Sequence, residues 1–117
     1  MPEWQKILRT TDLFQIMSGL SYKIIFSDAA SIDLSDIQTY TELTFGKAQK
    51  ELYQQKLNRG FLSIQNMPTI GHNHPLIADN LRLLNIEKHV VIYKIIEELK
   101  IIHILRIVHQ KVNLGTI

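Results

Sequence analysis

The pattern of apolar positions begins with a short β-prone run and then changes to helical spacing. Residues 22–26 read YKIIF, which predicts a strand. Ser27 and Asp28 follow, and either side chain can cap a helix because its oxygen accepts a bond from an unpaired backbone N–H. The next apolar or small residues recur at helical intervals and predict a first helix with one buried face: Ala30, Leu34, Ile37 and Thr41.

A second helix is predicted after Gly46, which interrupts the first pattern. Its apolar positions are Ala48, Leu52, Tyr53, Leu57, Phe61 and Ile64. Gly60 lies inside this pattern and weakens a helix by about 1 kcal/mol relative to alanine. The two segments together predict a helical hairpin, and the Pro, Gly and Asn residues of segment 66–75 predict a loop after it.

The last third of the chain is rich in β-branched residues, which crowd a helix and suit a pleated sheet. Polar pairs at 87–88 and 97–98 divide it into three strands, 81–86, 89–96 and 100–109, joined by tight hairpins. The order β-α-α-β-β-β predicts an α+β fold, a helical hairpin packed on a small twisted, mainly antiparallel sheet. Seven residues are expected to be buried: Leu34, Ile37, Leu52, Leu57, Ile92, Ile104 and Val108.

The last strand carries cationic and titratable side chains within an apolar run. Strict alternation places Ile102, Ile104, Arg106 and Val108 on one face, and Ile101, His103, Leu105, Ile107 and His109 on the other. Both faces are largely apolar and the helices cover one of them, so the other face suggests a partner. Arg106 is expected to lay its stem over apolar surface and reach the carboxylate of Asp33 or Asp36 on the first helix.

Composition narrows the possible functions. With 117 residues the chain has room for one domain, and a net charge of +2 is too weak to argue for nucleic acid, although it suits an acidic protein partner. The absence of cysteine excludes disulfides, a thiol nucleophile and a zinc–thiolate site. Charged residues interrupt the apolar region 90–108, so no membrane span is expected. His72 and His74 form an isolated pair that holds a metal only with further ligands, so neither a metal nor a cofactor is expected.

Five segments carry a family resemblance through their order and spacing: YKIIFSDAASIDLSDIQTY, FGKAQKELYQQKL, MPTIG, LRLLNIEKHVVIYKI and ILRIVHQK. They resemble the ParE branch of the RelE/ParE toxins of bacterial toxin–antitoxin systems, from about Tyr22 to about Lys111. The resemblance implies a cytoplasmic toxin that binds and poisons DNA gyrase, without direct nucleic-acid specificity and without a membrane partner. It also implies a cognate antitoxin whose small acidic C-terminal segment neutralises the toxin in a hetero-oligomer.

Two alternatives stay open beside the gyrase poison, namely a RelE-like, ribosome-dependent mRNA interferase and a degenerate toxin fold that only binds an antitoxin-like partner. RNA cleavage needs a base, an acid and a cation for the phosphate. RelE-like nucleases resemble one another in carrying an arginine near the position of Val90, and many also use a tyrosine or histidine close to the C-terminus. Here no tyrosine follows Tyr93, and segment 112–117 has no acid, base or cation. Only this alternative has candidate catalytic residues, which are His109, Lys111 and Arg82. The favoured hypothesis has none and assigns partner binding to His103, Leu105, Ile107, His109 and Lys111.

The family resemblance divides the chain into an N-terminal extension, residues 1–20, and a toxin domain, residues 21–117. Met17 opens a segment that would be a natural start for such a toxin. We therefore expect residues 1–16 to be dispensable for the fold. The amphipathic piece around Trp4, Ile7 and Leu8 is expected to form a short helix on the domain when it is ordered.

Overall fold

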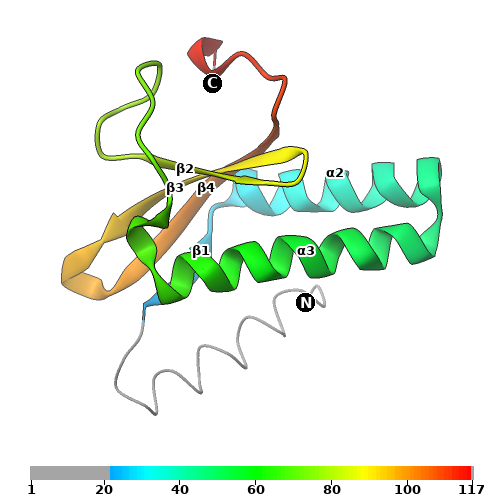
Figure 1. The fold of residues 1–117 in the computed structure, drawn as a ribbon, viewed down its shortest axis with the longest axis horizontal. Coiled ribbons are helices and arrows are strands. Elements are labelled where there is room, and N and C mark those ends of the chain that lie inside the picture. Colours follow the sequence, from blue (N-terminus) through cyan, green and yellow to red (C-terminus); the bar gives the residue numbers. More distant parts are fainter. Residues whose placement is uncertain (1–21, 117) are drawn as a thin grey trace.

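The computed structural model describes residues 22–116, and the predicted N-terminal extension with its short helix lies outside the described residues. The elements are β1 (Lys23–Phe26), α2 (Asp28–Phe45), α3 (Lys47–Asn66), β2 (Arg82–Ile86), β3 (His89–Ile96) and β4 (Ile101–His109), with short 3-10 turns after α3, β3 and β4. Their order confirms the predicted β-α-α-β-β-β arrangement. The hairpin of α2 and α3 lies along one face of the sheet (Figure 1).

The four strands form one mixed sheet in the order β1-β4-β3-β2. β1 is parallel to β4, and the other two pairings are antiparallel. The last strand along the chain is therefore an inner strand of the sheet, between the first strand and β3. β4 therefore forms hydrogen bonds with β1 along one edge and with β3 along the other.

Local chemistry explains where the helices begin and end. The Ser27 hydroxyl accepts a bond from Ala30 N at 3.0 Å and donates to the Leu105 carbonyl at 2.8 Å, so the predicted cap also ties the start of α2 to β4. Gly46 separates the helices with φ at 94°, a conformation that favours glycine. The predicted boundary between the two helices is thus confirmed.

The larger part of the core lies between the sheet and the helical hairpin, and Leu34, Leu57 and Ile104 are fully buried there, as predicted. Ile37 is half-buried and packs against this cluster. The prediction for Leu52 is wrong, because its side chain is 46% exposed. The hairpin continues beyond the sheet (Figure 1), and every residue from 42 to 49 is exposed, so this end of the hairpin has no apolar layer beneath it.

A smaller cluster lies on the opposite face of the sheet. It consists of Leu83, Val90, Ile92 and Val108, against which Ile77, Leu81 and Leu114 pack. Ile92 and Val108 are buried as predicted, but on the face away from the helices. The loop before β2 and the C-terminal turn therefore cover part of the sheet face for which the sequence predicted no covering element.

Candidate partner-binding site

The ladder between β3 and β4 contains a β-bulge. Tyr93 lies opposite Ile104, whereas its neighbour Ile92 lies opposite Arg106, so Leu105 is an extra residue on β4. An extra residue reverses the alternation of side chains beyond it. The second half of β4 therefore presents its side chains to the faces opposite to those predicted.

The bulge corrects the predicted faces of β4. Ile107 is only 3% exposed and belongs to the core cluster beneath the helices, whereas Val108 belongs to the smaller cluster on the other face. The five residues expected to share a partner-binding face therefore do not share one. Ile107, His109 and Lys111 line one hollow, and His103 and Leu105 do not.

The edge of β4 is open on one side beyond the bulge. β1 ends at Phe26, which pairs with Ile104, so no strand within residues 22–116 lies on the β1 side of residues 105–109. The start of α2 occupies part of this edge through the Ser27 bond to Leu105 and a bond from Ile107 N to Asp33 Oδ2 at 2.8 Å. Backbone groups of a partly open edge can pair with a strand from another chain.

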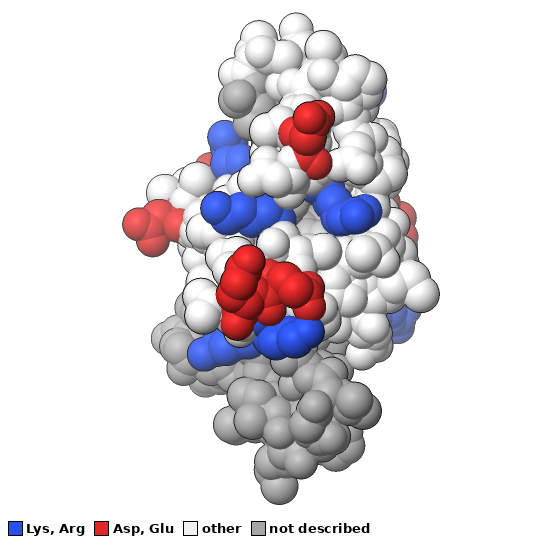
Figure 2. All heavy atoms as spheres, turned by 90° about the vertical axis from the view of Figure 1, so that its left-hand side faces the viewer, with Lys and Arg blue, Asp and Glu red and all other residues white. Residues whose placement is uncertain are grey.

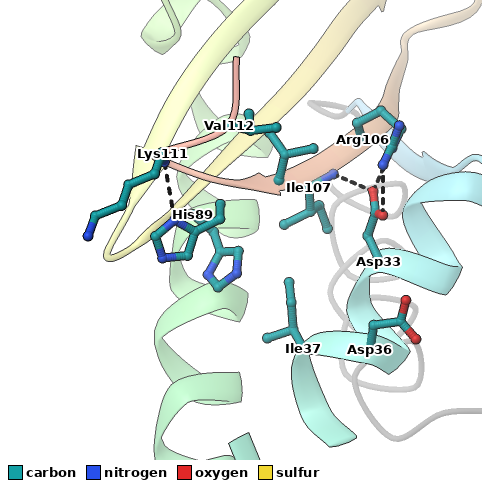
Figure 3. Close-up of a pocket in the computed structure, with 10 residues that line it drawn as sticks. Asp33, Asp36, Ile37, His89, Arg106, Ile107, Lys111 and Val112 are labelled. Atoms are coloured by element: carbon teal, nitrogen blue, oxygen red, sulfur yellow. Dashed lines mark hydrogen bonds and ion pairs between the residues drawn. The ribbon is translucent and has the colours of Figure 1, made fainter. Parts of the chain in front are cut away.

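Arg106 reaches across this edge to α2. Its Nε lies 2.8 Å from Asp33 Oδ2 and its second guanidinium nitrogen 3.1 Å from Oδ1, a bidentate pair. The predicted contact with the first helix is confirmed for Asp33, whereas Asp36 extends away from Arg106 (Figure 3). The hydrogen bonds from Arg106 to Asp33 raise the pKa of the guanidinium. Arg106 is therefore engaged in an ion pair within the domain.

Two histidines meet at the end of the β3–β4 ladder. His89 and His109 are cross-strand partners, and their ring centroids lie 5.5 Å apart in an edge-to-face arrangement. Lys111 N–H donates to Nδ1 of His109 at 3.1 Å, so this nitrogen carries no proton in the bonded form. His109 thus holds the first residues of the C-terminal segment.

His89 is bonded to the second helix. The Tyr53 hydroxyl lies 2.6 Å from His89 Nδ1 and accepts a bond from Lys88 N at 3.2 Å, so the hydroxyl proton is available for the imidazole. Burial, with the neighbouring His109 as a smaller cause, lowers the pKa of His89. Burial also raises the pKa of Tyr53, and both shifts favour a neutral tyrosine–histidine pair near pH 7.

These side chains surround an open hollow of about 440 Å³ between α2, the end of β4 and the C-terminal segment. Figure 3 shows the hollow with Asp33 turned toward Arg106 and the Ile107 backbone, and with Lys111 at the opposite side. Its lining residues are Asp33, Asp36, Ile37, His89, Arg106, Ile107, Val108, His109, Lys111 and Val112. Apolar walls beside an open strand edge suit the docking of a peptide segment.

The three candidate catalytic residues of the nuclease alternative do not come together. His109 and Lys111 line the hollow, whereas Arg82 starts β2 and its guanidinium donates to the carbonyls of Gly71 at 2.7 Å and Thr69 at 3.3 Å. Strand order puts Arg82 two strands away and about 13 Å further along the sheet. The role of Arg82 is to hold the loop after α3.

His89 is a site residue that the sequence reasoning missed. A regular ladder continuing from the pair Ile96 and Ile101 would place Val108 opposite His89, and the bulge places His109 there instead. The signal available in the sequence was a histidine directly after the turn at 87–88, at the same end of the sheet as His109. A cross-strand histidine pair required both the turn and the bulge to be known.

The side of the molecule that lies at the left of Figure 1 carries charges of both signs. Figure 2 shows Lys or Arg and Asp or Glu interspersed over this side of the molecule. On the sheet itself, burial and the nearby cation of Lys94 lower the pKa of His103. Among the described residues, this side of the molecule therefore carries charges of both signs.

No helix within residues 22–116 is long and apolar enough to cross a membrane.

Comparison with known proteins places the chain in a family. Residues 24–114 match the model of the family described as ParE toxin of type II toxin-antitoxin system, parDE. A solved structure entitled "Chromosomal ParDE TA system from P. aeruginosa" is similar with a TM-score of 0.64 and 20% identity, and the match covers 75% of this chain and 95% of that one. No curated protein matches the sequence. The match over residues 24–114 shows that the chain belongs to the ParE toxin family of type II toxin–antitoxin systems.

Proposed function

We propose that this ParE toxin acts by occupying a surface of DNA gyrase, without a catalytic step of its own, and that a ParD-type antitoxin neutralises it. The family supports the gyrase target by resemblance, and the similar solved structure is of a ParDE system. The observation that carries the binding mode is the β4 edge at residues 105–109 beside the hollow, which the start of α2 covers only in part. A surface of this kind recognises an extended segment through backbone bonds and side-chain pockets.

The antitoxin segment adds a strand to the open edge of β4 and places apolar side chains in the hollow against Ile37 and Val112. Val112 is 37% exposed, so its apolar surface is accessible to a partner. An acidic side chain of the segment lies near the Lys111 ammonium at the rim of the hollow. Because Asp33 already neutralises Arg106, Lys111 is the cation of the hollow that an acidic partner can use.

One observation favours the alternative of an mRNA interferase. His89 and His109 are in contact beside Lys111, and two imidazoles in different environments can divide the roles of acid and base. The distinguishing assay combines purified protein with gyrase and supercoiled DNA, and in parallel with programmed ribosomes and mRNA. The proposal expects trapped, cleaved DNA with gyrase. Cleavage of ribosome-bound mRNA without any effect on gyrase would establish the alternative instead.

The antitoxin site is tested separately by affinity. Val112→Glu and Lys111→Glu place a carboxylate in the hollow and at its rim, and each should weaken antitoxin binding about tenfold or more, a change of about 1.4 kcal/mol. Leu99→Glu is the matched control, because Leu99 is 66% exposed on the turn between β3 and β4. If the three variants bound the antitoxin with equal affinity, the antitoxin would bind at another surface. This result would leave the proposed gyrase target untouched.

A further inference from the structure

A chain of side-chain contacts runs from α3 to residues 111–116 through two histidine rings. It starts at the Tyr53 hydroxyl, which lies 2.6 Å from Nδ1 of His89. The ring of His89 contacts the ring of His109, and Lys111 N–H donates to Nδ1 of His109 at 3.1 Å. The chain of contacts therefore ends at the segment whose first residues, Lys111 and Val112, line the hollow.

The hydrogen bond between Lys111 and His109 requires a neutral ring. A ring nitrogen that accepts a bond carries no proton, whereas an imidazolium carries protons on both nitrogens. At His89 the Tyr53 oxygen can also accept a bond from a protonated ring, so the contact with Tyr53 survives protonation. The hydrogen bond that protonation breaks is therefore the one at Lys111.

The surroundings of the two rings offer little compensation for a positive charge. Within residues 22–116 neither ring is hydrogen-bonded to a carboxylate. Two of the nearby carboxylates are in ion pairs, namely Asp33 with Arg106 and Glu87 with Lys56. The other charged groups on the elements around the rings are Asp36, Lys88 and Lys111.

The two rings differ in their access to solvent. Burial, with the neighbouring His109 as a smaller cause, lowers the pKa of His89. His89 is half-buried and bonded to Tyr53, whereas His109 is exposed. His89 therefore stays neutral beside a ring that is open to solvent protons.

Residues 111–116 depend on the turn at His109 for their position. Within the described residues, the hydrogen bonds that this segment donates are accepted by His109 and Asn113. Gln110 N–H donates to the Lys88 carbonyl just before the segment, and Leu114 packs on the smaller apolar cluster. The bond to the His109 ring thus sets the direction in which the chain leaves β4.

We propose that the His89–His109 pair is a proton-operated latch for residues 111–116. Neutral His109 holds Lys111 and directs the segment along the hollow, while His89 packs against His109 and positions its ring. A proton on His109 breaks the bond to Lys111 and releases the segment, while the four strands stay paired. Histidine is the side chain that ordinarily makes such a change between pH 5 and 8.

Release of the segment removes one wall of the hollow, because Lys111 and Val112 leave their places together. The consequence for an antitoxin bound there rests on the proposed function. The latch itself rests on contacts within this chain and is tested without a partner.

Two other turns of the chain provide matched controls. Nδ1 of His74 accepts a bond from Leu76 N at 3.0 Å, and Oδ1 of Asn113 accepts one from Gly115 N at 3.0 Å. In both turns a side chain bonds the N–H two residues further on, as His109 does. In the variant His109→Asn an amide oxygen can therefore form the same bond without titrating.

Nitrogen-15 relaxation of the full chain measures the latch directly. At pH 7.5 we expect backbone order parameters of about 0.85 for Lys111 and Val112, as in rigid backbone, and values below about 0.6 at pH 5.5. His109→Asn should keep the high values at both pH values, and His109→Ala should give the low values at both. His74→Asn changes a turn of the same type away from the pair and should leave the response of Lys111 and Val112 unaltered.

Ile102 and Ile104 on β4 serve as internal references and should stay rigid at both pH values. Equal order parameters of Lys111 at the two pH values in the unaltered chain would overturn the proposal, as would a pH response that persists in His109→Asn. A parallel loss of order at Ile104 would overturn it as well, because the whole domain would then unfold.

His89→Gln tests the positioning role of the second ring. The variant removes the ring that packs against His109, so it should lower the order parameter of Lys111 already at pH 7.5. An unchanged value would show that His109 acts alone and would overturn the assignment of the latch to a pair.

Discussion

His89 and His109 lie opposite each other at the end of the β3–β4 ladder, with ring centroids 5.5 Å apart. The extra residue Leu105 produces this pairing, since a ladder without it would bring Val108 to His89. The contact links β3, β4 and the C-terminal segment, because His109 accepts the Lys111 N–H and His89 is bonded to Tyr53 on α3. Protonation of either ring therefore acts on several elements at once.

The stability of the domain should fall as the pH is lowered from 7.5 to 5.5. Burial lowers the pKa of His89 below its unfolded value of 6.5. In this pH range His89 is therefore protonated more in the unfolded chain than in the folded chain, and this difference favours unfolding as the pH falls. The contribution is fully present above pH 6.5 and is lost as the pH falls through the lowered pKa. His103 acts in the same direction, since burial lowers its pKa too. Urea unfolding at both pH values measures the difference.

His89→Gln should reduce this pH dependence, because it removes an imidazole whose pKa burial lowers. A pH response that is identical in the wild-type chain and in the His89 variant would show that the imidazole pair is not its source.

Ile104→Ala should lower the free energy of unfolding by about 2–5 kcal/mol, the usual cost of truncating a large buried aliphatic side chain. Ile104 is fully buried under the helical hairpin, on the inner strand that pairs with both β1 and β3. Ile25→Ala is the control, because Ile25 is 39% exposed and should lose less than about 1 kcal/mol. Chemical denaturation gives both values, and a loss below the expected range for Ile104 would contradict its placement.

Asp33→Ala should destabilise the domain by about 1.5–3 kcal/mol, the typical value of a hydrogen bond to a charged group. The carboxylate accepts bonds from the Arg106 side chain and from Ile107 N, so its loss leaves both donors without their acceptor. Asp36→Ala removes a neighbouring carboxylate and should cost little. Chemical denaturation gives the midpoint of each variant. Equal midpoints would contradict the assignment of Asp33 as the acceptor that joins α2 to β4.

Gly60→Ala should destabilise the domain, although alanine is ordinarily the better residue inside a helix by about 1 kcal/mol. A Cβ at this position would lie 2.0 Å from Ile86 Cδ1 and 2.6 Å from its Cγ1, so the Ile86 side chain fills the space that a methyl group would need. Overpacking of this kind costs about 1–3 kcal/mol.

Ile86→Val removes the Cδ1 methyl group that the new alanine would meet. The double variant Gly60→Ala/Ile86→Val should therefore melt above Gly60→Ala alone. Melting temperatures that do not recover would show that the Cδ1 methyl group is not the atom that opposes the substitution.

His109→Ala should leave toxicity within a few-fold of the unaltered chain, whereas loss of a catalytic acid or base typically costs 10²–10⁴-fold. The expectation rests on the proposed binding mechanism and on the structural role of His109 as acceptor for Lys111 N. Growth arrest after induced expression, with protein levels matched, measures it. A loss of toxicity in the catalytic range would favour the nuclease.

The element order followed from the sequence because each boundary has a local chemical cause. Ser27 caps α2, Gly46 separates the helices, and the turn at 87–88 joins two strands. The pairing of Arg106 with Asp33 was also predictable, since a cation within an apolar strand requires a carboxylate within reach.

The bulge was not predictable from alternation. Nearly every position around Leu105 is apolar, so shifting the pattern by one residue leaves a strand that reads equally well. For this reason the hollow and its histidine pair could not be assembled from the sequence. Leu52 was misjudged for another reason, because periodicity shows which side of a helix is apolar but not how far the sheet extends beneath it.

The position of β4 has a consequence for the order in which the protein forms during synthesis. β4 is the last strand along the chain, yet it lies between β1 and β3 and pairs with both. On the ribosome, β1 and the helical hairpin therefore wait for their sheet partner until residue 109 has emerged, since chain separation delays such contacts. A nascent chain shorter than this holds neither the β4 edge nor the hollow beside it, so the proposed antitoxin surface forms only in the last stage of synthesis.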